Sequence, residues 1–398
     1  MFHAQCGTFA NYLGSHYWNL VDDNFIESDE SSFSEGKPNL FILESSLALG
    51  PTGFEGFGGM EAGNHTEFNI NENVEIRNEE KEARHEYQKY LEDLESGLIT
   101  NSSNATFDWD SSVRYWCDFW KARPFPDCMQ ILPPAADLRA SFWWENSVDV
   151  DFTESSIRKS IERMDTIHAS VNSCDLLEGF APYYLKLLEF IRDEFPKKSI
   201  LTYLPCENKP SDSFYINFSK VFEVCESFST ILVADAQNTY NSCIKANNCP
   251  DDNHHLTKFT SSAALGAQLQ VLWDTKNARK LDPGLIHTEM VLTRTNDIQR
   301  EGLSFQRELN VPTPFPQRLL RNSGENVEQM HANVQVFTRH TEKSRTLKEC
   351  SKAMEVFRKS ELRKNDILEL DEWLATEELI RVSRDNEAVE GEDSESDQ

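Results

Sequence analysis

Basic residues are scarce in this sequence: 39 lysines and arginines stand against 67 aspartates and glutamates, which gives a formal net charge of −28. A protein that binds nucleic acid neutralises phosphates with a basic face, and adsorption to anionic lipid needs clustered basic side chains. The composition therefore argues against nucleic acid as a partner and against broad adsorption to membranes. We interpret the acidity as a source of solubility.

Long apolar runs and paired cysteines are also missing. No stretch of about 18 consecutive apolar residues occurs, so we expect no transmembrane segment. The first 20 residues contain no Lys or Arg, unlike a secretory signal or a transit peptide. The nine cysteines are odd in number and scattered, without a short disulfide framework. We therefore expect a soluble protein of a reducing compartment, with at most peripheral membrane contact.

The apolar residues that are present predict a sizeable core. Hydrophobic residues make up 39% of the chain and include 25 Phe and 8 Trp. Short apolar runs alternate with helical patterns, which is typical of a mostly parallel sheet covered on both faces. The strands are predicted over 39–43, 199–204 and 229–235, and the helices over 79–98, 153–171, 182–194, 211–228 and 254–273.

The last hundred residues differ in character. The segments 342–363 and 366–383 are charged and helix-prone, and 385–398 holds seven acids without a basic residue. We divide the chain into an N-terminal segment, a central α/β domain, a mostly helical C-terminal region and an acidic disordered tail. Their respective ranges are 1–78, 79–275, 276–384 and 385–398.

The opening of the chain is its most informative stretch. A short apolar run leads into Gly7, and an aromatic-rich helical pattern then extends to about Trp18. A strand, a turn and a helix N-terminus form a place that favours anions, because free backbone amides and the helix dipole point at one spot. On the residues alone, an ordinary strand-to-helix turn remains the alternative.

The same stretch carries a family resemblance. It resembles the opening of tubulin, and more closely that of the Misato family, whose members carry the pattern G-x-x-x-N-Y-x-G-x-H-x-W-N. Three later segments are similar to that family in the same order, namely 111–126, 174–180 (CDLLEGF) and 187–203. The residues that fill the opening pattern are Gly7, Asn11, Tyr12, Gly14, His16, Trp18 and Asn19. The resemblance covers roughly residues 1–275 and implies a tubulin/FtsZ-like, Rossmann-type parallel sheet with helices on both faces.

The glycine-rich phosphate loop of tubulins has no counterpart here. In tubulins the Gly-Phe motif runs into a strand and then into that loop, whose amides hold the phosphates. Here Gly179-Phe180 passes through Ala181-Pro182 directly into a predicted helix, and a helix that starts at this point cannot replace the loop. Divergence and loss of a segment from the sequence both remain possible causes.

Other nucleotide contacts implied by the resemblance are mostly lost. Ala236 stands where tubulins have an Asn, with Asn238 two residues away, and Ser46 stands where they have a magnesium-associated acid. The segment 276–281 lacks the acid that completes the neighbouring subunit's site. The remaining vestigial nucleotide-binding candidates are Gly7, Thr8, Asn11 and Asn253. We therefore expect no cofactor, with GTP as the alternative.

The sequence contains little evidence for a metal site or for a catalytic site. Thiolates and imidazoles at short spacing can bind Zn²⁺, but the spacing of the candidate set departs from known finger patterns, so we expect no metal. Serines lack a G-x-S-x-G context and the histidines are dispersed, so we expect no enzyme. The candidate metal set comprises Cys243, Cys249, His254 and His255.

The family resemblance also implies a role. It implies a non-catalytic tubulin-like protein that acts in mitochondrial distribution, morphology and inheritance. It further implies a location in the cytoplasm and on the mitochondrial outer surface, and contact with the cytosolic chaperonin and with outer-surface proteins. A GTP-binding, filament-forming tubulin relative and a spindle or cytoskeletal scaffold are the alternatives.

Overall fold

The computed structural model of this chain describes the parts of it that form the sheet, its helical layers and the segments joining them; for β9 to β11 it describes the backbone. The described residues are 2–23, 32–45, 48–49, 84–99, 107–122, 124–125, 128–132, 150–164, 167, 169–177, 179–207, 211–246, 256–273, 284–293, 303–311, 314–316, 319, 330–339, 343–361, 376 and 378–382.

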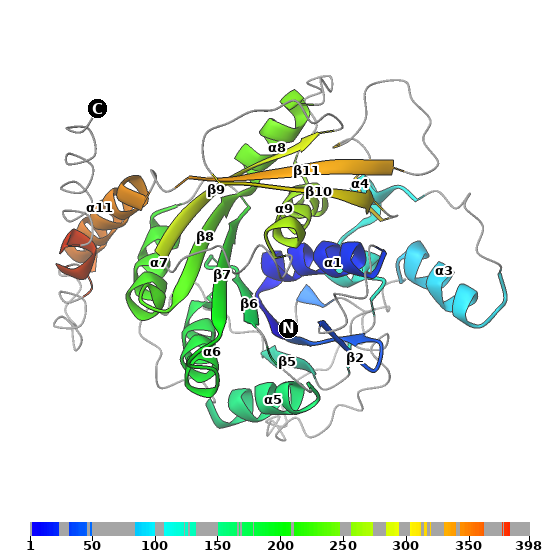
Figure 1. Ribbon diagram of the computed structural model, residues 1–398, viewed down its shortest axis with the longest axis horizontal. Helices are drawn as coiled ribbons and strands as arrows, with labels where there is room; N and C mark the ends of the chain where they lie inside the picture. Colours follow the sequence, from blue (N-terminus) through cyan, green and yellow to red (C-terminus); the bar gives the residue numbers. More distant parts are fainter. Residues whose placement is uncertain are drawn as a thin grey trace, which may run out of the picture.

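Strands and helices alternate along most of the chain (Figure 1). The first half contains β1 (Phe2–Cys6), α1 (Thr8–Asp23), β2 (Phe33–Ser34), β3 (Lys37–Pro38), β4 (Leu40–Ser45), α3 (Glu86–Glu95), α4 (Trp109–Ser112), the 3₁₀ helix η3 (Trp116–Phe119), β5 (Met129–Leu132), α5 (Val150–Glu162) and β6 (Ala169–Cys174). The second half contains α6 (Ala181–Glu194), β7 (Ser199–Cys206), α7 (Asp212–Cys225), β8 (Ser229–Asp235), α8 (Ala236–Ala246), α9 (Lys258–Trp273), β9 (Gly284–Thr293), β10 (Leu303–Val311), β11 (Met330–Arg339) and α11 (Lys343–Glu361).

Within the described residues, nine of the strands form one sheet, in the order β10-β11-β9-β8-β7-β6-β1-β4-β5. All pairs from β5 to β9 are parallel, and β11 runs antiparallel to both β9 and β10. From β5 to β8 the order is that of the doubly wound nucleotide-binding fold, in which the chain starts in the middle and winds outward in both directions. This confirms the predicted Rossmann-type, tubulin-like fold.

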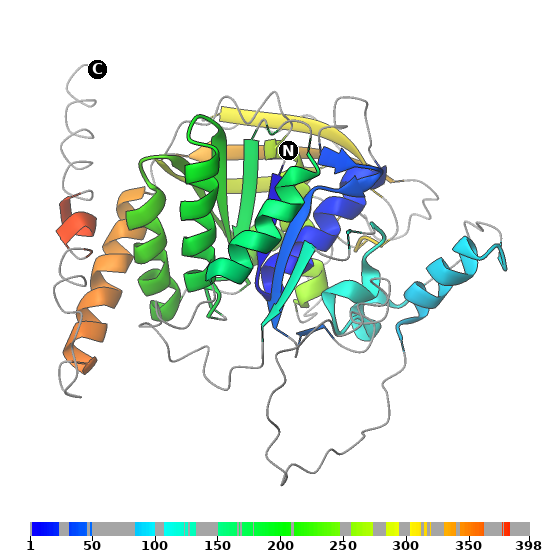
Figure 2. The same ribbon diagram turned by 90° about the horizontal axis from the view of Figure 1, so that it is seen from below.

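The central strands are buried along their whole length, as expected for a sheet covered on both faces. Every residue of β1 is buried, and so is every residue of β7 after Ser199. Two separate apolar clusters lie on the two faces. One joins α1, α9 and the η3 segment to the sheet, and the other joins α5, α6, α7 and α11 to it. Figure 2 shows the second group of helices side by side in front of the strands.

Local sequence explains where several helices begin and end. Ser211 lies before α7 and its hydroxyl accepts a hydrogen bond from the Phe214 amide at 3.3 Å, which is an N-cap. Pro182 stands in the first turn of α6, where its missing N–H costs nothing. Gly97 follows α3 with a φ of +73°, the left-handed conformation typical of a helix C-terminus.

The predicted strands over 39–43, 199–204 and 229–235 are confirmed as β4, β7 and β8, and the helices over 182–194, 211–228 and 254–273 as α6, α7 and α9. The helix predicted over 153–171 is wrong beyond Glu162, because residues 169–174 form strand β6 between β1 and β7. The sequence of β6 has no clear period, since Ser170, Asn172 and Ser173 are polar and yet buried. Its neighbours in the sheet decide its conformation.

The C-terminal region combines helix and strand. Helix α11, Lys343–Glu361, lies within the helix predicted over 342–363 and packs against α7. The three strands β9, β10 and β11 lie earlier in the same region and were not predicted from the sequence. Their pairing partners are far away in the chain, so local pattern carries little information about them. The predicted acidic tail over 385–398 lies outside the described residues.

Candidate functional site

The candidate site lies where β1 and β6 end. The sheet continues from β1 through β4 to β5 on one side and from β6 through β7 to β8 on the other. In doubly wound sheets, ligands bind outside the carboxyl ends of the strands at the point where the winding reverses. The turn at Gly7 and the loop after Cys174 meet at this point, which is the place that the sequence predicted.

Gly7 makes the turn from β1 into α1. Its φ is +95°, and its amide donates to the Leu43 carbonyl at 3.0 Å. A Cβ at this position would lie 2.8 Å from Phe180 Cδ2 and 2.9 Å from Asp175 Cβ. Glycine is therefore required both by the backbone conformation and by the close approach of the loop that follows β6.

Thr8 and Asn11 hold the carboxylate of Glu44, the fifth residue of β4. The Thr8 hydroxyl donates to Glu44 Oε1 at 3.1 Å, and Asn11 Nδ2 donates to Glu44 Oε2 at 2.8 Å. The Ser45 amide donates to Oε1 at 2.7 Å, and Glu44 is fully buried. Each carboxylate oxygen thus accepts at least one hydrogen bond from the protein itself, which is how a buried charge is stabilised.

Asp175 lies on the other side of Gly7 and caps α1. Its Oδ2 accepts from the Phe9 amide at 3.3 Å, and its Oδ1 accepts from the Leu177 amide at 3.0 Å. The Asp175 amide donates to the Cys6 carbonyl at 2.8 Å, which ties the loop to β1. A carboxylate at a helix N-terminus is favoured by the helix dipole. The place expected to attract an anion therefore holds one that the chain supplies.

The loop after β6 is short and closes over the turn at Gly7. Gly179 has a φ of +78°, and Phe180 is buried, with its ring in contact distance of the Gly7 backbone. Helix α6 then begins at Ala181, one residue before the predicted start at 182. In tubulins a strand follows the Gly-Phe motif. Here the strand beside β1 is β6, which ends at Cys174, the first residue of the CDLLEGF segment. The described part of the chain thus leads from β6 into α6 without a glycine-rich phosphate loop.

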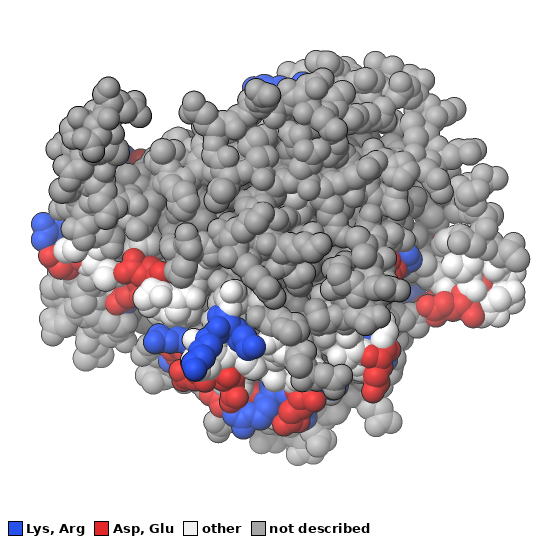
Figure 3. Space-filling view, in the orientation of Figure 1, with Lys and Arg blue, Asp and Glu red and all other residues white. Residues whose placement is uncertain are grey.

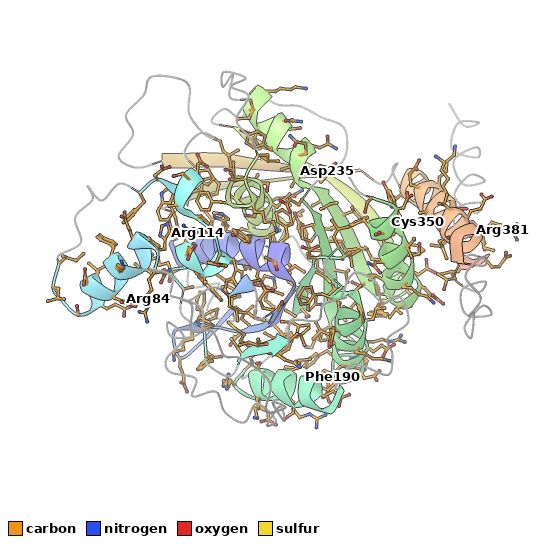
Figure 4. The ribbon with its side chains drawn as sticks, turned by 180° about the vertical axis from the view of Figure 1, so that it is seen from behind. Arg84, Arg114, Phe190, Asp235, Cys350 and Arg381 are labelled. Atoms are coloured by element: carbon orange, nitrogen blue, oxygen red, sulfur yellow. The ribbon has the colours of Figure 1, made fainter. Side chains whose placement is uncertain are left out.

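Two of the remaining predicted positions, Ala236 and Asn238, lie in the first turn of α8. Ala236 is buried as the first residue of α8. Asn238 is tied to Asp235, with its backbone amide 2.9 Å from Oδ1 and its side-chain amide 2.8 Å from Oδ2. Figure 4 shows Asp235 where β8 meets α8. Asn238 is therefore engaged in the start of this helix. Asn253, Ser46 and the segment 276–281 lie outside the described residues.

Of the four residues of the candidate metal set, the structure describes Cys243. Cys243 is fully buried on α8, and Cys249, His254 and His255 lie outside the described residues. The two thiols nearest the candidate site are Cys6 and Cys174, paired across β1 and β6. Burial raises the pKa of both thiols well above the ordinary value. A buried thiol with a raised pKa is a poor nucleophile and a poor metal ligand.

The other residues of the opening pattern hold α1 in place. Tyr12 donates its hydroxyl to the Arg114 carbonyl at 2.6 Å, and Asn19 bridges the Phe119 carbonyl and the Lys121 amide, both at 2.9 Å. Figure 4 shows Arg114 beside α1. These contacts bind α1 to the aromatic segment 111–126, so that part of the pattern is structural.

Helix α9 crosses α1 on its other side. His16 Nε2 lies 2.9 Å from the Phe259 carbonyl, and burial lowers the pKa of His16 to about 3, so the imidazole is neutral and donates this bond. A Cβ at Gly266 would lie 2.9 Å from His16 Cβ and 3.1 Å from the Leu13 carbonyl oxygen. Gly266 therefore sets the closeness of the two helices, and no signal in the sequence marked it.

The sequence named Gly7, Thr8 and Asn11, which lie at one turn of the structure, but it did not name Glu44 and Asp175 as the acids beside them. A signal for both existed, because each acid stands at or just after the end of a buried parallel strand. The carboxyl ends of parallel strands share one edge of a sheet. A search for polar residues at those ends would have found them.

Comparison with known proteins gives one informative relative. No family model matches the chain. The chain is similar to the protein misato of Drosophila melanogaster, with 24% identity over an alignment of 250 residues. The alignment covers 49% of this chain and 42% of that protein, so the chain spans less than half the length of its relative. This similarity confirms, over about half of the chain, the resemblance to the Misato family that the sequence carries.

Proposed function

We propose that this chain is a non-catalytic, tubulin-like protein that acts in mitochondrial distribution, morphology and organisation. One observation supports the non-catalytic part: at the winding reversal, Asp175 accepts a hydrogen bond from the Phe9 amide, and Asp175 and Phe180 lie against the turn at Gly7. The organelle role is what the resemblance to the Misato family implies. In this proposal the sheet serves as a scaffold, and the surfaces around it bind other proteins.

The proposed location is the cytoplasm and the outer surface of mitochondria, with the cytosolic chaperonin and outer-surface proteins as partners. Within the described residues, no helix is long and apolar enough to cross a membrane. On the face seen in Figure 3, basic and acidic side chains of the described part are interspersed. Ion pairs of the described part include Arg158–Glu194, between α5 and α6, and Lys186–Glu189 within α6. A mixed surface of this kind favours protein partners over phosphate backbones.

A GTP-binding tubulin relative is the second candidate, because the strand order and the turn at Gly7 are those of a nucleotide-binding sheet. Calorimetry of the full chain with GTP and Mg²⁺ separates the two. We expect no hydrolysis and a Kd weaker than about 1 mM, since each lost charge-assisted contact costs about 1.5–3 kcal/mol. Micromolar affinity that disappears in Gly7→Val would contradict the non-catalytic proposal.

The location is tested in cells with tagged full-length chain. We expect a diffuse cytosolic pool and a mitochondrial pool that added protease removes from intact organelles. Depletion of the protein should disturb the distribution of mitochondria, and the tagged chain should co-purify with the cytosolic chaperonin. An organellar pool that resists protease until the outer membrane is opened would contradict the peripheral location.

A further inference from the structure

The N-terminus of α1 is capped in an unusual way. No acid lies in the first turn of this helix, so its own sequence supplies no negative charge for the dipole. The charge comes instead from Asp175, 166 residues away, whose Oδ2 accepts from the Phe9 amide. The compensating carboxylate therefore comes from the loop after β6, at the point where ligands of such sheets bind.

Three contacts hold Asp175 in this position. Its amide is bonded to the Cys6 carbonyl, its Oδ1 to the Leu177 amide, and its Oδ2 to the Phe9 amide. The residue is 5% exposed. A carboxylate that is nearly removed from solvent and accepts bonds from two separate backbone segments is fixed in place, as a bound anion would be.

A second carboxylate stands close to the same helix turn. Glu44 is fully buried and is bonded to Thr8 and Asn11 of α1. A phosphate group that approached the helix N-terminus would meet the Phe9 amide already engaged and two carboxylates nearby. Like charges that lie close together repel strongly where solvent is excluded.

We infer that the Asp175 carboxylate is a built-in substitute for a phosphate group at the N-terminus of α1, and that it keeps this helix end closed to phosphate-bearing molecules. This inference rests on the proposed non-catalytic function and adds the residue that enforces it. It predicts that the helix end regains affinity for a tetrahedral anion once the carboxylate is removed.

The experiment compares thermal unfolding of the full chain in inorganic phosphate and in chloride at matched ionic strength. The variants are Asp175→Ala, which leaves space for an ion, and Asp175→Asn, which keeps the shape without the charge. Ser211→Ala is the control, since it removes a cap of α7 that is local and neutral. Any general effect of phosphate on a helix that has lost its cap appears in this control.

We expect both Asp175 variants to melt below the wild type in chloride. Phosphate at about ten times its Kd should then raise the Tm of Asp175→Ala by about 3 °C more than that of the wild type or of Ser211→Ala. Equal phosphate shifts in all four proteins would overturn the inference. So would an Asp175→Asn variant with the Tm of the wild type, because the charge would then be unnecessary.

Two further outcomes are decisive. If Asp175→Ala does not fold in chloride, recovery of its folded state in phosphate supports the inference, and failure to recover overturns it. GTP binding to the wild type would contradict the proposed function, whereas absence of a phosphate effect in the variants contradicts only the role of Asp175. The two failures are therefore distinguishable.

Discussion

At the scale of single residues, the candidate site depends on positions that tolerate no change in shape or charge. Gly7 is one, because its φ of +95° and the nearby Phe180 ring leave no room for a side chain. Outside the site, burial lowers the pKa of His3 and His16 to about 3, so both are neutral in the folded chain. Both lead to measurable effects on stability.

Substitution of Gly7 by Val should lower the Tm whether or not GTP is present. The left-handed backbone costs about 1–2 kcal/mol for a residue with a Cβ, and the overlap with Phe180 and Asp175 adds about 1–3 kcal/mol. Gly36→Val is the control, because Gly36 has a φ of +73° but no atom within 4 Å of the point where a Cβ would lie. Equal losses in the two variants would show that crowding by the loop after β6 has no effect.

Replacement of His3 by Phe should make the protein less sensitive to acid. Burial lowers the pKa of His3 from 6.5 to about 3. The unfolded chain therefore gains a proton below pH 6.5 that the folded chain refuses, so stability is full above pH 6.5 and falls as the pH decreases toward 3. One such histidine contributes a slope of about 1.4 kcal/mol per pH unit.

The measurement is the free energy of unfolding at pH 7 and pH 5. His3→Phe keeps an aromatic ring against Tyr17 and Trp18, whose ring centroids lie 5.0 and 5.7 Å away. The variant should lose less stability between the two pH values than the wild type does. His16, also with a pKa of about 3, retains its share of the slope. An unchanged pH dependence would show that His3 is accessible to protons in the folded state.

At the scale of elements, α1 contacts several parts of the described structure, namely the sheet, α9 and the η3 segment. It follows β1 in the chain and crosses α9 at Gly266. Tyr12 and Asn19 connect it by hydrogen bonds to the aromatic segment 111–126. Most of its residues are buried. The opening pattern therefore describes how one helix is held on three sides, in addition to the turn that begins it.

Substitution of Asn19 by Ala should destabilise the protein by about 2–4 kcal/mol, because a buried carbonyl and a partly buried amide lose their partners at once. Asn241→Ala on α8 is the matched control, since that side chain is exposed and accepts a hydrogen bond from Gln237 of the same helix. Denaturant unfolding of both variants checks the difference. Equal effects would show that Asn19 does not anchor α1.

At the scale of the whole molecule, two helical layers enclose the sheet, and α11 completes one of them. Leu347, Cys350 and Met354 of this helix are buried in the same cluster as α6 and α7. Thr376 donates its hydroxyl to Glu223 of α7 at 2.5 Å, so residues beyond α11 also contact α7. Figure 4 shows Cys350 on the side of α11 that faces α7.

Truncation after residue 342 should therefore lower the Tm and promote aggregation. A fully buried Leu or Met side chain contributes about 1.5–3 kcal/mol, so the loss of α11 removes several kcal/mol and exposes apolar surface of α7. Truncation after residue 384 is the control, since it removes only the acidic tail and should leave the Tm unchanged. The prediction fails if both truncated chains melt together with the full chain.

The sequence by itself determined the elements with strong local patterns. Apolar runs such as 229–235, and helices with a cap or an N-terminal proline such as α7 and α6, were predictable because neighbouring residues decide them. The opening pattern also predicted the strand, the turn and the helix that place Gly7, Thr8 and Asn11 together. Composition alone determined the charge and the expected surface.

Only the tertiary structure decided what those residues contact. Asp175 reaches the Phe9 amide across 166 residues of chain, and Asn11 reaches Glu44 across 33. Such contacts depend on strand order and register, which no local pattern encodes. The strand β6 was missed for the same reason, since its polar residues are stable in the sheet only between β1 and β7. The tertiary structure therefore decides that the helix start after Gly7 contacts the carboxylate of Asp175.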